Sequence, residues 1–161
     1  LKLLDRQTLK KGGLMVEIDP RPGEQHSYPA PKKDLLAQAV GKKTVSVVDS
    51  TAGWAQDTLA LFRMGYQVTS IERSPVMAEL IRDGFERLVQ KDWVIKRELT
   101  PPKLLVGNAI ELLGKLPENP DCMAATGRRV VVKSPDYAEP LGGKPSESYQ
   151  GKLLRYDVYL K

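Results

Sequence analysis

The sequence predicts an α/β domain in which helices cover a mostly parallel β-sheet. Three apolar runs typical of buried strands, at 45–48, 67–71 and 103–106, are separated by stretches with the apolar spacing of helices. Two later runs, 129–133 and 154–160, are rich in β-branched and aromatic residues and flank a loop rich in Gly, Pro and Ser. This pair favours an antiparallel hairpin that closes the sheet.

Size and composition are those of a single globular domain. The chain has 161 residues, of which 41% are hydrophobic and 28% charged. No apolar run approaches the roughly 18 residues of a membrane-spanning helix. The lone Cys122 and the lone His26 argue against a disulfide framework and a metal centre, and they point to a reducing cytoplasm. A net charge of +5 favours a polyanionic partner such as a nucleic acid.

The N-terminal part is expected to be a small extension, residues 1–30, in front of the main domain, residues 31–161. The apolar run 14–18 predicts a short β-strand in this extension, which the Pro- and Gly-containing stretch 19–23 ends. The main domain then opens with a helix over 32–40 that stops at Gly41.

The next stretch, 45–88, has the order strand, turn, helix, strand, acidic residue, helix. In a parallel sheet the carboxyl ends of neighbouring strands share one edge, where a nucleotide-like cofactor lies over the first turn and a carboxylate binds its ribose hydroxyls. Here the first strand ends in the turn 49–53, and the second ends at Glu72. Glu72 follows Asp49 by 23 residues, about the separation that this arrangement requires.

Two further signals extend the same pattern. Ser74 is a good N-cap and Pro75 suits the first helical position, so a helix is expected to begin directly after Glu72. The third strand, 103–106, ends at Gly107, and Asn108 and Ala109 lead into a short helix over 110–116. Residues after all three strands are therefore predicted to meet at one edge.

The first turn favours S-adenosylmethionine over a dinucleotide. Gly53 is followed by Trp54, Ala55 and Gln56, so the G-x-G-x-x-G fingerprint of pyrophosphate binding is missing. A sulfonium and an amino-acid carboxylate do not need that cradle. Asp49 and Asp57 could face the ammonium and the cationic centre, while the backbone amides near Ala52 and Gly53 bind the carboxylate. A nicotinamide-dependent oxidoreductase remains an alternative at this point.

Three motifs resemble one known family. The stretches 48–57, 71–84 and 128–141, in this order, are similar to motifs of the bacterial small-subunit ribosomal RNA methyltransferases called RsmJ. The likeness extends, with interruptions, from about Pro31 to Lys161. It implies a Rossmann-like class I methyltransferase with S-adenosylmethionine as donor and no metal. It also implies methylation of the exocyclic N2 of a guanine in 16S ribosomal RNA, either as free RNA or in the 30S subunit.

The resemblance also assigns residues. The family's cofactor contacts fall on Gln56 and Asp57, on Glu72 and Arg73, and on Asn108 and Ala109. With the turn, the expected cofactor-binding set is Asp49, Thr51, Ala52, Gly53, Gln56, Asp57, Glu72, Arg73, Asn108 and Ala109. Lys133, Asp136 and Tyr137 follow a late strand and are candidates for contact with RNA or the target base. Phosphate contacts are considered for Lys32, Lys33, Arg128 and Arg129.

The chain departs from the family in two places. Its first turn has Trp54, Ala55 and Gln56 where the family usually has Leu-Gly-Arg. The family's Asp-Pro-x-Phe/Tyr-Pro motif, which follows the fourth strand and contacts the methylated base, is absent, so catalytic residues are not assigned.

This absence has a structural counterpart in the length of the chain. The stretch between Asn108 and Arg128 is too short for a strand and its crossover helix, because a βαβ unit takes roughly thirty residues. We therefore expect a segment to be missing between Asp121 and Cys122. A non-catalytic RNA-binding protein is the alternative.

Overall fold

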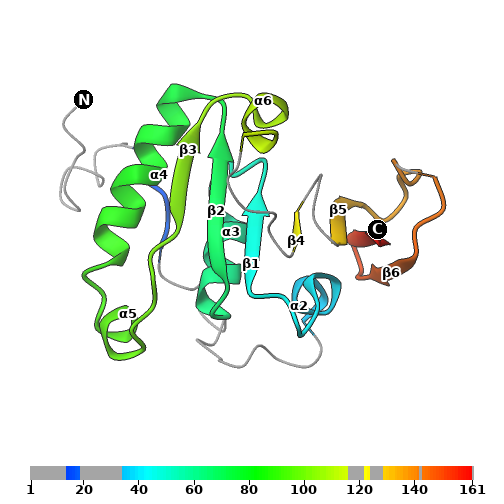
Figure 1. Ribbon diagram of the computed structural model, residues 1–161, viewed down its shortest axis with the longest axis horizontal. Coiled ribbons are helices and arrows are strands. Elements are labelled where there is room, and N and C mark those ends of the chain that lie inside the picture. The colour runs from blue at the N-terminus through cyan, green and yellow to red at the C-terminus, as the bar shows by residue number, and fades with distance from the viewer. Residues whose placement is uncertain (1–13, 19–33, 116–121, 124–128, 142, 161) are drawn as a thin grey trace.

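The fold is one seven-stranded sheet covered by helices on both faces (Figure 1). The computed structural model describes residues 14–18, 34–115, 122–123, 129–141 and 143–160. Its strand order is β3-β2-β1-β4-β5-β7-β6. The first five strands in this order pair in parallel, whereas β7 runs antiparallel to both of its neighbours. The strands are β1 (Ser46–Asp49), β2 (Gln67–Glu72), β3 (Lys103–Val106), β4 (Cys122–Met123), β5 (Arg129–Pro135), β6 (Glu147–Gln150) and β7 (Leu154–Leu160).

Helix boundaries follow the capping signals of the sequence. The Asp34 carboxylate accepts the Ala37 N–H at 2.9 Å, and Ser74 caps the long helix with Pro75 at its first position. The helices are α2 (Leu35–Val40), α3 (Gln56–Arg63), α4 (Pro75–Leu88), α5 (Asp92–Lys96) and α6 (Ala109–Leu113). The predicted helices are confirmed with small shifts of their ends, whereas α5 was not predicted.

The core lies on both faces of the sheet because successive strand residues point in opposite directions. On one face Val47 of β1 joins the large cluster that contains Leu59 and Phe62 of α3 and Ile81 of α4. On the other face its neighbour Val48 packs with Ile71, beneath Leu112 and Leu113 of α6. Two buried layers therefore hold β1 and β2 in place, and with them the residues that follow these strands.

The prediction of a β-strand at residues 14–18 is wrong. Residues 14–18 are described as chain without strand pairing, although Val16 and Ile18 are buried. Their carbonyls accept hydrogen bonds from side chains instead of from a neighbouring strand: Arg87 donates to Val16 O at 2.9 Å and Arg63 to Ile18 O at 2.8 Å. The rest of the expected extension lies outside the described residues.

The C-terminal part contains one strand more than the predicted hairpin. The two runs do pair antiparallel, from Arg129 opposite Leu160 to Pro135 opposite Leu154. The additional strand is β6, which lies in the loop between them and pairs with β7 at the edge of the sheet. Its side chains are mostly exposed. The sequence therefore lacks the alternation of apolar residues that would predict a strand here.

The connection from β4 to β5 is unusually short. Both strands are parallel neighbours, and only residues 124–128 join them. A parallel crossover takes a dozen or more residues and usually contains a helix. A covering helix therefore cannot be formed by the residues available between these strands.

Candidate functional site

The carboxyl ends of β1, β2 and β3 meet at one edge of the sheet, as predicted. Val48 lies opposite Thr69 and Asp49 opposite Ser70, while Glu72 lies opposite Val106. The helices α3, α4 and α6 all begin near this edge, because each follows one of these strands (Figure 1). The residues that the sequence selected after each strand are therefore brought into one region.

Asp49 braces the first turn. Its Oδ1 accepts the Thr51 N–H at 3.2 Å, and its Oδ2 accepts the Thr58 hydroxyl at 2.6 Å. The Thr58 hydroxyl also lies 3.1 Å from that of Ser70, so the turn is tied to both α3 and β2. Burial raises the pKa of Asp49, and the hydrogen bonds from Thr58 and Thr51 oppose that rise.

Two backbone N–H groups of the first turn donate hydrogen bonds to acceptors within the protein. The Ala52 N–H donates to Ile71 O at 3.0 Å, and the Gly53 N–H donates to Oε2 of Glu72 at 2.9 Å. Gly53 and Ala55 take positive φ values of 52° and 55°, which turn the chain into α3. Both amides thus have protein acceptors in this structure, and their binding of a ligand carboxylate stays a prediction.

Glu72 has the geometry expected of a ribose ligand. Its Oε1 accepts the Ser74 N–H at 2.7 Å, and its Oε2 accepts the Gly53 N–H. A carboxylate oxygen has two lone pairs, so each oxygen keeps capacity for one more donor. The half-buried side chain is thus fixed from both sides and can still accept two hydroxyl groups.

Of the remaining predicted cofactor contacts, Asn108 and Ala109 have structural roles, and Arg73 is open to solvent. Asn108 is the N-cap of α6 and accepts the Ile110 N–H at 3.0 Å, which leaves its Nδ2 donor outside the cap. Ala109 packs against the Val48–Ile71 cluster. Arg73 is exposed.

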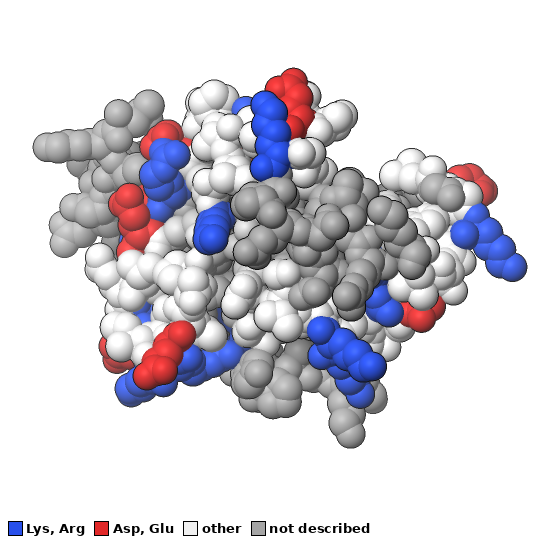
Figure 2. Space-filling view, in the orientation of Figure 1, with Lys and Arg blue, Asp and Glu red and all other residues white. Residues whose placement is uncertain are grey.

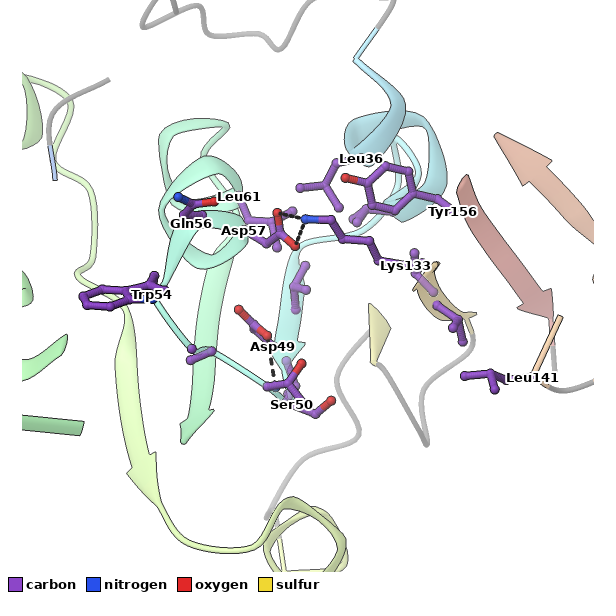
Figure 3. Close-up of a pocket in the computed structure, with 18 residues that line it drawn as sticks. Leu36, Asp49, Ser50, Trp54, Gln56, Asp57, Leu61, Lys133, Leu141 and Tyr156 are labelled. Carbon is purple, nitrogen blue, oxygen red and sulfur yellow. Dashed lines mark hydrogen bonds and ion pairs between the residues drawn. The ribbon is translucent and has the colours of Figure 1, made fainter. Parts of the chain in front are cut away.

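A pocket of about 670 Å³ opens beside the first turn, between α2, α3, β5 and β7 (Figure 3). Of the predicted site residues, those lining it are Asp49, Thr51, Ala52, Gly53, Gln56, Asp57 and Lys133. Sequence reasoning missed Leu36, Leu141 and Tyr156, which come from distant elements. Trp54 also lines the pocket, but its indole lies on the side away from Lys133 (Figure 3).

An ion pair crosses this pocket. The Lys133 ammonium lies 2.9 Å from Oδ1 and 2.8 Å from Oδ2 of Asp57 (Figure 3). Both side chains remain partly open to solvent, at 38% and 37% exposure. Tyr156 lies opposite Lys133 in the β5–β7 register, and burial, together with the charges of Asp57 and Asp34, raises the pKa of its hydroxyl to about 12.

The loop after β5 places the other substrate candidates outside the pocket lining. Arg155 fixes this loop by donating to the Asp136 and Ala138 carbonyls, at 3.0 and 2.8 Å. The Tyr137 side chain is 87% exposed. Arg129, considered above for phosphate contact, donates instead to Ala39 O at the end of α2, at 2.8 Å. Lys32, Lys33 and Arg128 lie outside the described residues.

The described residues contain neither a metal-binding cluster nor a membrane-spanning helix. No cluster of three or more His, Cys, Asp or Glu side chains that could hold a metal ion is found there. Within the same ranges, no helix is long and apolar enough to cross a membrane.

The fold and the site together define a class I S-adenosylmethionine-dependent methyltransferase. The order β3-β2-β1-β4-β5 is that of a nucleotide-binding sheet, and the antiparallel β7 between β5 and β6 adds the closing hairpin. The structure is similar to that of the SAM-dependent methyltransferase NGO1261 from Neisseria gonorrhoeae, with a TM-score of 0.66, 29% identity and coverage of 80% of this chain and 71% of that one. An rRNA methylase from Streptococcus thermophilus shares the fold, with a TM-score of 0.52, 13% identity and coverage of 80% and 93%.

The sequence comparisons identify the family. A family model described as putative SAM-dependent methyltransferase matches residues 1–124 and 122–161. Ribosomal RNA small subunit methyltransferase J of Shewanella sp. strain MR-4 is 32% identical, over 100% of this chain and 79% of that protein. The protein of the same name from Shewanella oneidensis is 31% identical, over 100% and 83%. The chain belongs to this family, the RsmJ type of rRNA methyltransferase, and its cofactor is S-adenosylmethionine.

The relatives have a stretch of sequence that this chain lacks. The match to the Shewanella sp. protein extends over 210 positions, 49 more than the 161 residues of this chain. The family model is matched in two pieces that meet at residues 122–124, beside the short β4–β5 connection. Relatives therefore carry residues for which this chain has no counterpart.

Proposed function

We propose that the protein transfers a methyl group from S-adenosylmethionine to the exocyclic N2 of a guanine in 16S ribosomal RNA. The observation that carries this proposal is Glu72, fixed at the end of β2 by two backbone N–H groups, beside a single-glycine turn in a chain of the RsmJ family. The family's reaction acts on ribosomal RNA of the small subunit, which is found in the cytoplasm.

The residues present fit the donor. Glu72 has two free acceptor sites for the ribose hydroxyls, and the Asn108 Nδ2 could donate to the adenine edge. The pocket beside the turn then receives the amino-acid end, next to Asp57. The donor supplies an electron-poor methyl group on sulfur. The chain contributes by holding the donor and the base in line, which removes the entropic cost of bringing them together.

The substrate side is proposed to lie over the loop that follows β5. Tyr137 offers an exposed ring on which a base can stack, and Leu141, which is 82% exposed, lines the pocket. On the face shown in Figure 2, the Lys and Arg side chains of the described residues stand in separate groups, several of them beside Asp or Glu. Base contact near the pocket therefore has better support than a single basic surface on this face.

The test is methyl transfer from radiolabelled S-adenosylmethionine to 30S subunits that lack the modification, with free 16S rRNA in parallel. We expect label in the RNA, at the N2 of one guanine after digestion and chromatography. RNA without label, from protein that is folded and binds the donor, would favour the non-catalytic RNA-binding alternative. Binding of NAD in place of S-adenosylmethionine would favour an oxidoreductase.

We further propose that the active protein contains a segment between Asp121 and Cys122 that this sequence lacks. Two observations support it: the family motif that contacts the methylated base is absent, and relatives have 49 more positions. The segment would supply the residues that carry this motif.

Peptide mapping of the natural protein checks this proposal. We expect no peptide in which Asp121 is joined directly to Cys122. A peptide that joins these two residues would mean that the segment was deleted from the protein itself.

A further inference from the structure

We infer that Lys133 binds the carboxylate of the amino-acid end of the cofactor, and that the Lys133–Asp57 pair exchanges partners when the cofactor enters. Asp57 then accepts the cofactor's ammonium group while Lys133 donates to its carboxylate. This inference rests on the proposed function, and it moves Lys133 from the RNA side of the site to the cofactor side.

The carboxylate needs a donor other than the Ala52 and Gly53 amides. The Ala52 N–H is used by Ile71 O at 3.0 Å, and the Gly53 N–H by Glu72 at 2.9 Å. Breaking the second bond would also release one side of the residue that is proposed to hold the ribose. A ligand carboxylate at these amides would therefore weaken its own site.

Lys133 is the one cationic side chain among the described residues that line the pocket. Asp49 and Asp57 line the same pocket, so without a cation its charge would repel a carboxylate. Lys133 comes from β5 and points across the pocket toward α3 (Figure 3). Its ammonium is thus the group in this pocket to which a carboxylate can bind.

The charges of the Lys133–Asp57 pair are complementary to those of the cofactor's amino-acid end. The α-carbon of an amino acid carries an ammonium and a carboxylate side by side, and the Lys133–Asp57 pair presents the opposite charges at contact distance, 2.8 Å. Inserting the zwitterion replaces one ion pair with two. The exchange needs little desolvation, because both side chains are more than one-third exposed, and exposed ion pairs contribute little to stability.

Three other residues that line the pocket add no competing charge. The Tyr156 hydroxyl, whose pKa is about 12, stays neutral near Asp57 and so adds no negative charge to the pocket. Leu36 and Val131 also line the pocket, and both are apolar. The ion pair is therefore the charged feature of this part of the pocket that a zwitterion can use.

The test measures the affinity of Lys133→Met and of the unmodified protein for three adenosine ligands by calorimetry. S-adenosylhomocysteine has the complete amino-acid end, its decarboxylated analogue lacks only the carboxylate, and 5′-methylthioadenosine lacks both charged groups. We expect Lys133→Met to weaken S-adenosylhomocysteine about 10-fold or more, the effect of one lost charge-assisted contact. The other two ligands should change less than about twofold, within the scatter of such contacts.

Three variants complete the design. Lys133→Arg retains the charge and should recover most of the affinity for S-adenosylhomocysteine. Asp57→Asn removes the acceptor of the ammonium and should weaken the decarboxylated analogue as well. Lys103→Met removes an exposed lysine at the amino end of β3, away from the pocket, and should change nothing.

Two results would overturn the inference while leaving the proposed function in place. Equal weakening of all three ligands by Lys133→Met would make the ion pair a structural tie between α3 and β5. Unchanged affinity for S-adenosylhomocysteine, with weaker binding of ribosomal RNA, would return Lys133 to the RNA side. If the unmodified protein binds none of the three ligands, the proposed function itself fails.

Discussion

Replacing Glu72 with glutamine is expected to weaken the binding of S-adenosylhomocysteine about 100-fold, because hydrogen bonds to a charged group contribute about 1.5–3 kcal/mol each and two ribose hydroxyls depend on this carboxylate. The substitution also turns one acceptor into an NH₂ donor. That donor would face either the Gly53 or the Ser74 N–H, both of which now donate to Glu72. Part of the loss therefore comes from a loosened turn.

Calorimetric titration gives the affinity directly, and Glu79→Gln is the matched control. Glu79 lies on the exposed side of α4 and pairs with Arg82. The same change of charge there should leave the affinity within about twofold, since exposed ion pairs contribute little. An unchanged affinity of Glu72→Gln would show that the ribose is held elsewhere, and the cofactor site would need a different location on the sheet.

Replacing Asp157 with asparagine is expected to lower the free energy of unfolding by about 2 kcal/mol, as for the loss of a hydrogen bond to a charged group. The Asp157 carboxylate is fully buried and accepts hydrogen bonds from Arg155 Nε at 2.8 Å and from the Ser148 hydroxyl at 2.7 Å. Arg155 in turn fixes the loop after β5 through two carbonyls. Urea unfolding of both proteins at neutral pH measures the difference.

The pH dependence gives this prediction a second readout. The hydrogen bonds from Arg155 and Ser148 lower the pKa of Asp157 below its ordinary value of 3.8. The folded state therefore holds this proton less tightly than the unfolded state, and Asp157 stabilises the fold at pH values above 3.8. That stabilisation should disappear as the pH falls from 3.8 through the lower folded pKa, so the difference between protein and variant should shrink there. A difference that stays constant in acid would mean that Asp157 acts by packing alone.

Asp49 should behave in the opposite way. Burial raises its pKa, so the folded state holds the proton more tightly than the unfolded state. Its ionisation costs stability as the pH rises from 3.8 through the raised value. The turn therefore keeps an acidic group at some cost to stability, as is common at functional sites.

Much of the cofactor unit could be predicted because its signals are local. The strand periodicity of β1 and β2, the N-cap Ser74 and the following Pro75 depend on residues close in the chain, and the structure has each of them where the sequence placed it. The parallel pairing of β1, β2 and β3 then follows from the helices between them. It brings Glu72 beside the first turn without any long-range information.

The sequence-based predictions failed for segments whose hydrogen-bond partners are distant in the chain or are polar side chains. Residues 14–18 have the alternation of a strand, but their carbonyls pair with Arg63 and Arg87, which no local pattern foretells. The β6 strand has mostly exposed side chains, and its backbone pairs with β7. In both cases the hydrogen-bond partner, not the apolar pattern, decided the conformation.

The sequence by itself determined the order of elements from β1 to α4, the acidic end of β2 and the kinship with rRNA methyltransferases, since these depend on short motifs and near neighbours. Only the tertiary structure brought Lys133 to Asp57, 76 positions away in the chain, and gave the Gly53 N–H to Glu72. Which charges meet in a pocket depends on the register of strands and the start of a helix, and those are fixed by packing of the whole sheet. The candidate role of Lys133 therefore depends on the tertiary structure, which brings this β5 residue to Asp57 of α3.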